Sequence, residues 1–260
     1  MKLQFLAGVV AMVGLTGLAH ADGFSNGGFE TGTTAGWTTG GGYRGSVPNS
    51  SLLPAQFLPG GSRNGDNGTR GSVIDTSYVD PNLGALLGTT VLSGQYAYRA
   101  EDTTNGGNAT VISQKVSNYT ESKIYFAWKA VLENGGHVED ESALMKLTLT
   151  DDTTGQLLIS RSYNAGFDGS GVDSRFSTNG ELFYTANWQL EQLSIDQSLS
   201  GHSFTLSLLA ADCSPTGHTG YAYLDGFGSV APPVPEPTTY GMLLGGLGLL
   251  GFMARRKKSA

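Results

Sequence analysis

Short runs rich in β-branched and aromatic residues recur along the central part of the chain, each bounded by Gly, Asn, Asp or Ser. In residues 146–150 and 204–208 every second side chain is apolar, which is the period of a strand with one buried face. No stretch of ten or more residues holds a helical period. Short strands at this spacing predict an all-β fold, a β-sandwich. The predicted strands are 72–79, 89–99, 110–116, 123–132, 143–150, 156–163, 188–195, 203–210 and 221–228.

The composition supports a folded body with many turns. Of the 260 residues 39 are glycine, about double the usual share, and only 14% are charged. Both values disfavour a helix-rich protein. A chain with 39% apolar residues, 11 Tyr and 11 Phe is too hydrophobic to stay disordered. Within this body, the segment 40–71 is predicted to be a long surface loop.

The N-terminus is predicted to be a signal peptide over residues 1–21. Lys2 is followed by an uncharged apolar stretch that ends in Ala19-His20-Ala21, a pattern that signal peptidase accepts. Export of a mature chain that begins near Asp22 is therefore expected. A buried N-terminal helix is the alternative.

The C-terminus predicts a marginal membrane anchor. An apolar run over 240–254 would span about 22 Å as a helix, short of the ~30 Å hydrocarbon core. Cations after such a run stay on the cytoplasmic side and leave the preceding chain outside. These cations are Arg255, Arg256, Lys257 and Lys258, and the apolar run is preceded by Pro235, Glu236 and Pro237.

This order of Pro-Glu-Pro, short apolar helix and basic cluster resembles the PEP-CTERM sorting signal of Gram-negative bacteria. The resemblance implies processing by an exosortase near the PEP motif. It also implies an intermediate held in the inner membrane, followed by delivery to the cell surface or the extracellular polysaccharide matrix.

Three segments follow from these two termini: the signal peptide 1–21, a β-sandwich domain 22–230 and a sorting segment 231–260. The domain retains 21 of the 22 acids and 10 of the 15 bases, a net charge of −11. Such a surface repels nucleic acid and anionic membranes but favours cations, so no nucleic-acid partner is expected. The single cysteine, Cys213, cannot form an internal disulfide.

The two ends of the domain resemble jelly-roll, galactose-binding-like carbohydrate modules. The opening strand of such modules is similar to 26–32, which is followed by Gly36-Trp37, and the closing strand is similar to 221–227. In that superfamily a structural calcium ties these strands together, and the resemblance implies Glu30 and Asp225 as its carboxylates. Calcium needs six to eight oxygens, so backbone carbonyls would complete the shell. Alternatively, Glu30 caps a turn and Asp225 is solvated.

Segments 130–141 and 210–223 resemble a domain of adhesion-type bacterial surface proteins. They contain His137, Asp212, Cys213 and His218. His137 and His218 could converge with Asp212 on a metal or a substrate, or they could only shape the loops by hydrogen bonding. Cys213 is expected to be a small buried hydrophobe. The strands around 212–220 are expected to be neighbours that this loop bridges.

Two functions are open. The first is a non-catalytic surface or matrix protein that binds glycan or mediates adhesion, with no catalytic residues. Its candidate stacking platforms are Trp37, Tyr43, Tyr78 and Tyr98. The alternative is an exported polysaccharide-active enzyme of the glycosidase type that uses the acidic loop Glu139, Asp140 and Glu141, with Asp151 and Asp152 as further carboxylates.

Overall fold

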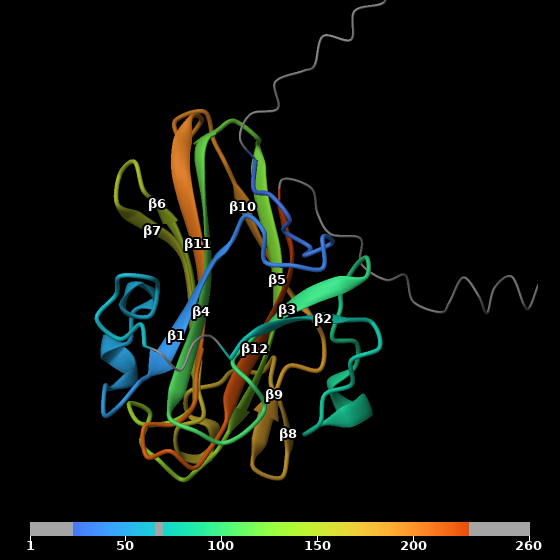
Figure 1. Cartoon of the computed structure of the whole chain (residues 1–260), viewed down its shortest axis with the longest axis vertical. Coiled ribbons are helices and arrows are strands. Elements are labelled where there is room, and N and C mark those ends of the chain that lie inside the picture. Colours follow the sequence, from blue (N-terminus) through green and yellow to red (C-terminus); the bar gives the residue numbers. More distant parts are fainter. Residues whose placement is uncertain (1–22, 66–69, 229–260) are drawn as a thin grey trace, which may run out of the picture.

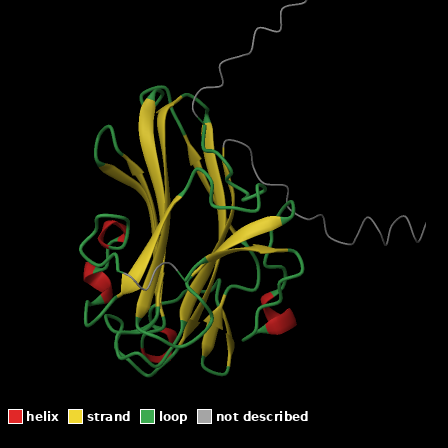
Figure 2. Ribbon diagram, in the orientation of Figure 1, coloured by secondary structure: helices red, strands yellow, loops and turns green. Residues whose placement is uncertain are grey.

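The computed structural model describes residues 23–65 and 70–228, and these form two antiparallel sheets packed face to face (Figures 1 and 2). One sheet has the strand order β1-β4-β11-β6-β7. The other has the order β2-β3-β12-β5-β9-β8, with β10 paired to β5 beside β9. The predicted jelly-roll β-sandwich is therefore confirmed.

The strands are β1 (Thr38–Tyr43), β2 (Ser72–Asp75), β3 (Tyr96–Ala100), β4 (Asn108–Tyr119), β5 (Lys123–Glu133), β6 (Leu144–Asp151), β7 (Gln156–Asn164), β8 (Ser177–Asn179), β9 (Leu182–Tyr184), β10 (Gln189–Ser194), β11 (His202–Ala211) and β12 (Gly220–Gly228). Short 3-10 turns are η1 (Asn49–Ser51), η2 (Pro54–Gln56), η3 (Gly84–Leu87) and η4 (Phe167–Gly169).

The main core lies between the two sheets. In β6 the apolar residues Leu147 and Leu149 are fully buried and alternate with half-buried polar residues, as the period of two requires. Trp128 of β5 is fully buried and stacks on Tyr163 of β7 with ring centroids 5.3 Å apart. This aromatic contact joins the central strand of one sheet to the edge strand of the other.

The outer face of each sheet is also covered by a long connecting segment. Residues 47–58 carry Leu52 and Phe57 onto the outer face of the five-stranded sheet, and residues 78–91 carry Leu83 and Leu87 onto the outer face of the seven-stranded sheet. Figure 1 shows these segments beside β1 and β2. This double cover explains why β5 and β11 are buried along almost their whole length.

All nine predicted strands are present, although 72–79 ends at Asp75 and 89–99 begins only at Tyr96. The prediction missed β1, β8 and β9. β1 was hidden because it contains three consecutive glycines, which weaken a strand. Two of these glycines allow close approach of another segment, since a Cβ on Gly40 would lie 2.1 Å from the carbonyl oxygen of Phe57 and one on Gly42 would lie 2.1 Å from that of Arg63. The predicted loop 40–71 therefore begins as a strand.

Two expectations about strand placement are wrong. Residues 26–32 form turns because Asn26, Phe29 and Gly32 have φ values of 50°, 58° and 68°, which no strand accommodates. The segment nevertheless lies against the closing strand, where Phe227 N–H donates to the Gly27 carbonyl at 3.1 Å. In addition, β11 and β12 belong to different sheets, so the loop 212–219 crosses from one sheet to the other.

The signal peptide 1–21, the PEP motif 235–237, the helix 240–254 and the cations 255–258 lie outside the described residues. Within 23–65 and 70–228, no helix is long and apolar enough to cross a membrane.

Candidate functional site

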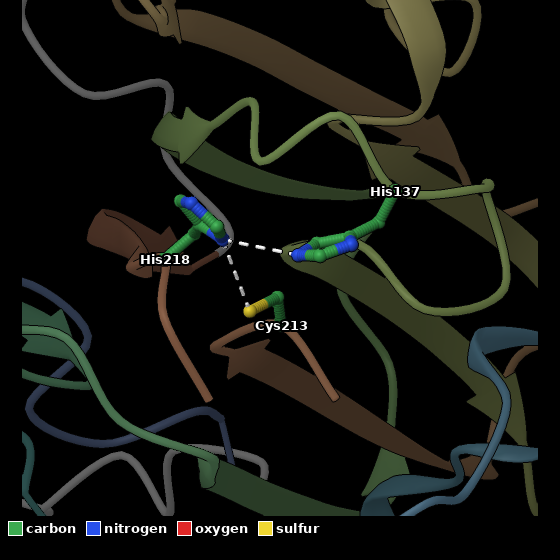
Figure 3. Close-up of side chains that lie close together, drawn as sticks. All are labelled: His137, Cys213 and His218. Atoms are coloured by element: carbon green, nitrogen blue, oxygen red, sulfur yellow. Dashed lines mark hydrogen bonds between the residues drawn. The ribbon is translucent and has the colours of Figure 1, made fainter. Parts of the chain in front are cut away.

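The loops at one end of the sandwich bring His137, Cys213 and His218 together (Figure 3). His137 comes from the β5–β6 loop, whereas Cys213 and His218 come from the β11–β12 loop. His218 Nδ1 lies 3.2 Å from His137 Nε2 and 3.4 Å from Cys213 Sγ. All three potential ligand atoms lie within 4.8 Å of one another. The two imidazoles are half-buried and the thiol is fully buried.

The β11–β12 loop is closed on itself by hydrogen bonds that set this geometry. Cys213 N–H donates to the His218 carbonyl at 3.0 Å, and Gly217 N–H donates to Cys213 Sγ at 3.2 Å. The facing loop has to be glycine at position 135, because a Cβ there would lie 2.1 Å from His218 Nδ1. The positions of both loops therefore depend on short-range backbone contacts around His218.

A buried cation lies beside this cluster. Arg44, at the end of β1, is fully buried and donates to the carbonyls of Asp212 at 2.6 Å and Ser142 at 3.2 Å. Burial lowers its pKa to about 10, while the negative charges of Cys213 and then Asp212 act in the opposite direction. Sequence reasoning missed Arg44 because it is far from Cys213 along the chain and belongs to no motif.

Asp212 does not join the two histidines. Its buried carboxylate accepts hydrogen bonds from the backbone N–H groups of Asn108 and Gly220, both at 3.2 Å. Burial raises the pKa of Asp212 to about 8, and the nearby negative charge of Glu101 adds to the effect. In the cluster the thiol of Cys213 takes the place that the carboxylate was expected to fill.

The implied calcium ligands Glu30 and Asp225 lie close enough to interact electrostatically. Asp225 is fully buried and accepts from the N–H groups of Leu92 at 2.8 Å and Ser93 at 3.1 Å. Glu30 accepts from the N–H of Gln95 at 3.0 Å. Burial raises the pKa of Asp225 to about 7, and the charge of Glu30 contributes. Asp225 is therefore not a solvated acid, and a cation between the carboxylates would offset the repulsion.

The surface of the seven-stranded sheet carries a groove of about 400 Å³ beside Trp188. The indole N–H donates to the Thr89 carbonyl at 3.1 Å, and Lys129 Nζ lies 5.7 Å from the centre of a Trp188 ring. Asn187 and Leu190 complete the exposed lining, and Leu190 is 45% exposed. Sequence reasoning had placed Trp188 only as the start of a strand.

The four predicted stacking aromatics divide into two pairs. Trp37 and Tyr98 are core residues, 8% and 1% exposed. Tyr43 is 54% exposed, and Tyr78 is half-buried at the edge of an adjacent pocket that also contains Val79 and Thr89.

The predicted acidic loop lies at the solvent surface. Glu139, Asp140 and Glu141 are exposed, and an Asp140 oxygen accepts from Ser50 N–H at 2.9 Å. Asp151 is instead buried at the β6–β7 turn, where it pairs with His202 Nδ1 at 2.8 Å.

Comparison with known proteins identifies one sequence motif. Residues 233–257 match the model of the PEP-CTERM protein-sorting motif. A search of curated proteins finds no match to the chain.

Solved structures with similar folds include three β-sandwich proteins. They are TmCBM61 in complex with β-1,4-galactotriose (13% identity, 78% of this chain and 93% of that chain, TM-score 0.40), CBM27-1 of Caldicellulosiruptor saccharolyticus in complex with mannohexaose (11%, 80% and 97%, 0.38) and the K1 cleaved adhesin domain of Lys-gingipain from Porphyromonas gingivalis W83 (10%, 77% and 94%, 0.37). The chain thus carries the PEP-CTERM sorting motif that its C-terminal sequence predicted, behind an all-β sandwich.

Proposed function

We propose that this protein is exported to the cell surface or the extracellular polysaccharide matrix of a Gram-negative bacterium, where its sandwich binds glycan without catalysing a reaction. The observation that carries the proposal is the match of residues 233–257 to the PEP-CTERM sorting motif, because such signals mark exported surface proteins. The sandwich, within the domain 22–230, is then the part that meets extracellular ligands.

The proposed route follows from the same segments. Removal of residues 1–21 exports the chain, and residues 240–254 with the four following cations hold it in the inner membrane. An exosortase then cleaves near Pro235, Glu236 and Pro237 and releases the domain from the rest of the sorting segment 231–260.

The groove beside Trp188 is the proposed glycan site. Sugar rings have apolar faces that stack on aromatic side chains, and hydroxyl groups that need hydrogen-bond partners. The groove places Trp188 and exposed Leu190 beside the polar groups of Asn187 and Thr89. The indole is fixed by its hydrogen bond to the Thr89 carbonyl, so little side-chain entropy is lost when a ligand stacks on it.

A structural calcium held by Glu30 and Asp225 is part of the proposal. The support is the buried pair of like charges at the point where the opening segment meets β12. The carboxylates also accept backbone N–H groups of residues 92–95, so a cation there would order three segments at once.

The glycosidase alternative has weaker support. A pair of catalytic carboxylates must lie within about 10 Å of each other. The acids 139–141 and 151–152 lie at opposite ends of β6, whose eight residues span about 26 Å. A catalytic pair would therefore have to come from within the exposed loop itself, where Glu139 and Glu141 are solvated.

Retention of the full-length chain on a panel of immobilised polysaccharides tests the glycan site. Trp188→Ala should weaken binding by at least about tenfold, because stacking on an aromatic ring contributes 1 kcal/mol or more. Tyr43→Ala is the matched control, since Tyr43 is an exposed aromatic outside this groove. Equal binding by both variants and the parent would refute the assignment of the groove. Release of reducing sugar that Glu139→Gln or Glu141→Gln abolishes would favour the enzyme instead.

A further inference from the structure

We propose that His137, Cys213 and His218 form a binding site for a transition-metal cation, Zn²⁺, at the end of the sandwich. The proposal is independent of glycan binding and of the calcium site. It rests on three potential ligand atoms that converge from two loops, in a part of the molecule where the fold itself does not require them to meet.

The spacing of the ligand atoms is that of a zinc site. Zn–N bonds of about 2.05 Å and Zn–S bonds of about 2.3 Å at tetrahedral angles place two nitrogens about 3.3 Å apart and a nitrogen and a sulfur about 3.6 Å apart. The observed separations are 3.2 Å between His137 Nε2 and His218 Nδ1 and 3.4 Å between His218 Nδ1 and Cys213 Sγ. Both observed values agree to within about 0.2 Å.

The choice of metal follows from the donor atoms. Two imidazole nitrogens and one thiolate suit zinc, whereas calcium and magnesium require oxygen ligands. Within the described residues no carboxylate belongs to the cluster, because the Asp212 side chain is turned to the backbone of residues 108 and 220. The site is therefore chemically distinct from the carboxylate pair at Glu30 and Asp225.

The surroundings of Cys213 suit a metal-bound thiolate. Sγ accepts the Gly217 N–H at 3.2 Å, and backbone N–H groups of this kind orient metal-bound thiolates. The guanidinium of Arg44 is buried beside it and interacts with its charge, which favours the anionic form that binds metal. On binding, the thiol proton is released to solvent and the sulfur lone pair is donated to Zn²⁺.

A bound metal would leave one coordination position for water or another ligand. Three protein ligands fill three of the four tetrahedral positions, and both imidazoles are half-buried, so the fourth position is reached from the solvent side. The metal would also link the β5–β6 loop to the β11–β12 loop, which no covalent bond joins.

The test titrates the metal-free full-length chain with Co²⁺, which reports thiolate ligation by a charge-transfer absorption, and then displaces Co²⁺ with Zn²⁺. We expect one equivalent per chain with the thiolate absorption. Cys213→Ser should abolish that absorption, and both Cys213→Ser and His137→Gln should weaken Zn²⁺ binding by at least roughly 100-fold. His202→Gln is the matched control, because its imidazole pairs with Asp151 in another part of the sandwich and should leave binding unchanged.

Absence of the thiolate absorption would overturn the proposal, as would equal Zn²⁺ affinity in the parent and in His137→Gln. If Cys213→Ser fails to fold, His137→Gln decides the matter, since His137 lies in a solvent-accessible loop. Zn²⁺ binding that survives both substitutions would identify carboxylates as the ligands and refute this site.

Discussion

Lys129 allows a quantitative test of how the groove beside Trp188 is built. Its side chain is 1% exposed, and Nζ donates to the carbonyls of Leu87 at 2.5 Å and Ala186 at 2.8 Å. Burial lowers the pKa of Lys129 from 10.5 to about 8, and the charge of Asp80 offsets only part of this effect. At 1.36 kcal/mol for each pKa unit, the lowering corresponds to about 3 kcal/mol.

The sign of the pH dependence follows from this lowered pKa. Below about pH 8 the amine is charged in both the folded and the unfolded chain, so the folded state bears the full penalty. Between about pH 8 and pH 10.5 the folded chain loses the proton first, so the free energy of unfolding rises with pH. Lys129→Met removes the titrating group and should remove this rise.

Urea unfolding at about pH 7.5 and pH 10.5 measures the effect, with the pH values chosen to bracket the shift. The free energy of unfolding of the parent, relative to Lys129→Met, should increase by about 3 kcal/mol between the two values. Tyrosines titrate equally in both proteins and cancel. Lys115→Met is the control, since the Lys115 side chain is 59% exposed and should show no such change. A parent and a Lys129→Met variant with parallel pH profiles would refute the reasoning.

Three further predictions concern other parts of the chain. Chelation of calcium should lower the melting temperature, with a loss of about 2.7 kcal/mol if calcium had been at a hundredfold excess over Kd, and Glu30→Gln should remove the response; an identical melt with and without chelator speaks against the site. Gly27→Ala should cost about 3 kcal/mol in urea unfolding, because its Cβ would lie 1.6 Å from the Phe227 carbonyl oxygen. Gly28→Ala is its control, with a nearest contact of 3.5 Å, and similar stability of the two variants would contradict the packing argument. Deletion of residues 255–258 should disturb membrane orientation, so cell fractionation should find less of the domain released; unchanged release would count against the anchor.

The strands that sequence reasoning identified are those whose side chains alternate, because alternation reports burial of one face directly. β1 escaped it because Gly40 and Gly42 contribute no side chains to a pattern, and their role becomes visible only when Phe57 and Arg63 pack against them. The segment 26–32 was misassigned for the opposite reason. Its composition matched an opening strand, but positive φ values at Asn26 and Phe29 are set by the surrounding fold.

The candidate metal site was partly visible in the sequence. Cys213 and His218 share one loop, and His137 belongs to the second distinctive segment, so all three were candidates. That the thiol rather than the Asp212 carboxylate faces the imidazoles depends on the path of the loop between the sheets. Arg44 could not be anticipated, because its approach to Cys213 requires the end of β1 to meet the β11–β12 loop.

The position of β12 determines how the domain responds to mechanical load. β12 is an interior strand, hydrogen-bonded to β3 on one side and β5 on the other, and the chain passes from its last residue, Gly228, towards the sorting motif that begins at residue 233. Tension applied through that segment while the body is held by a ligand enters the sheet along the axis of β12. Because antiparallel hydrogen bonds run perpendicular to the strand, they resist such a pull in shear, sharing the force, whereas an edge strand peeled sideways loses its bonds one at a time. The sandwich is therefore attached by one of its mechanically strongest strands.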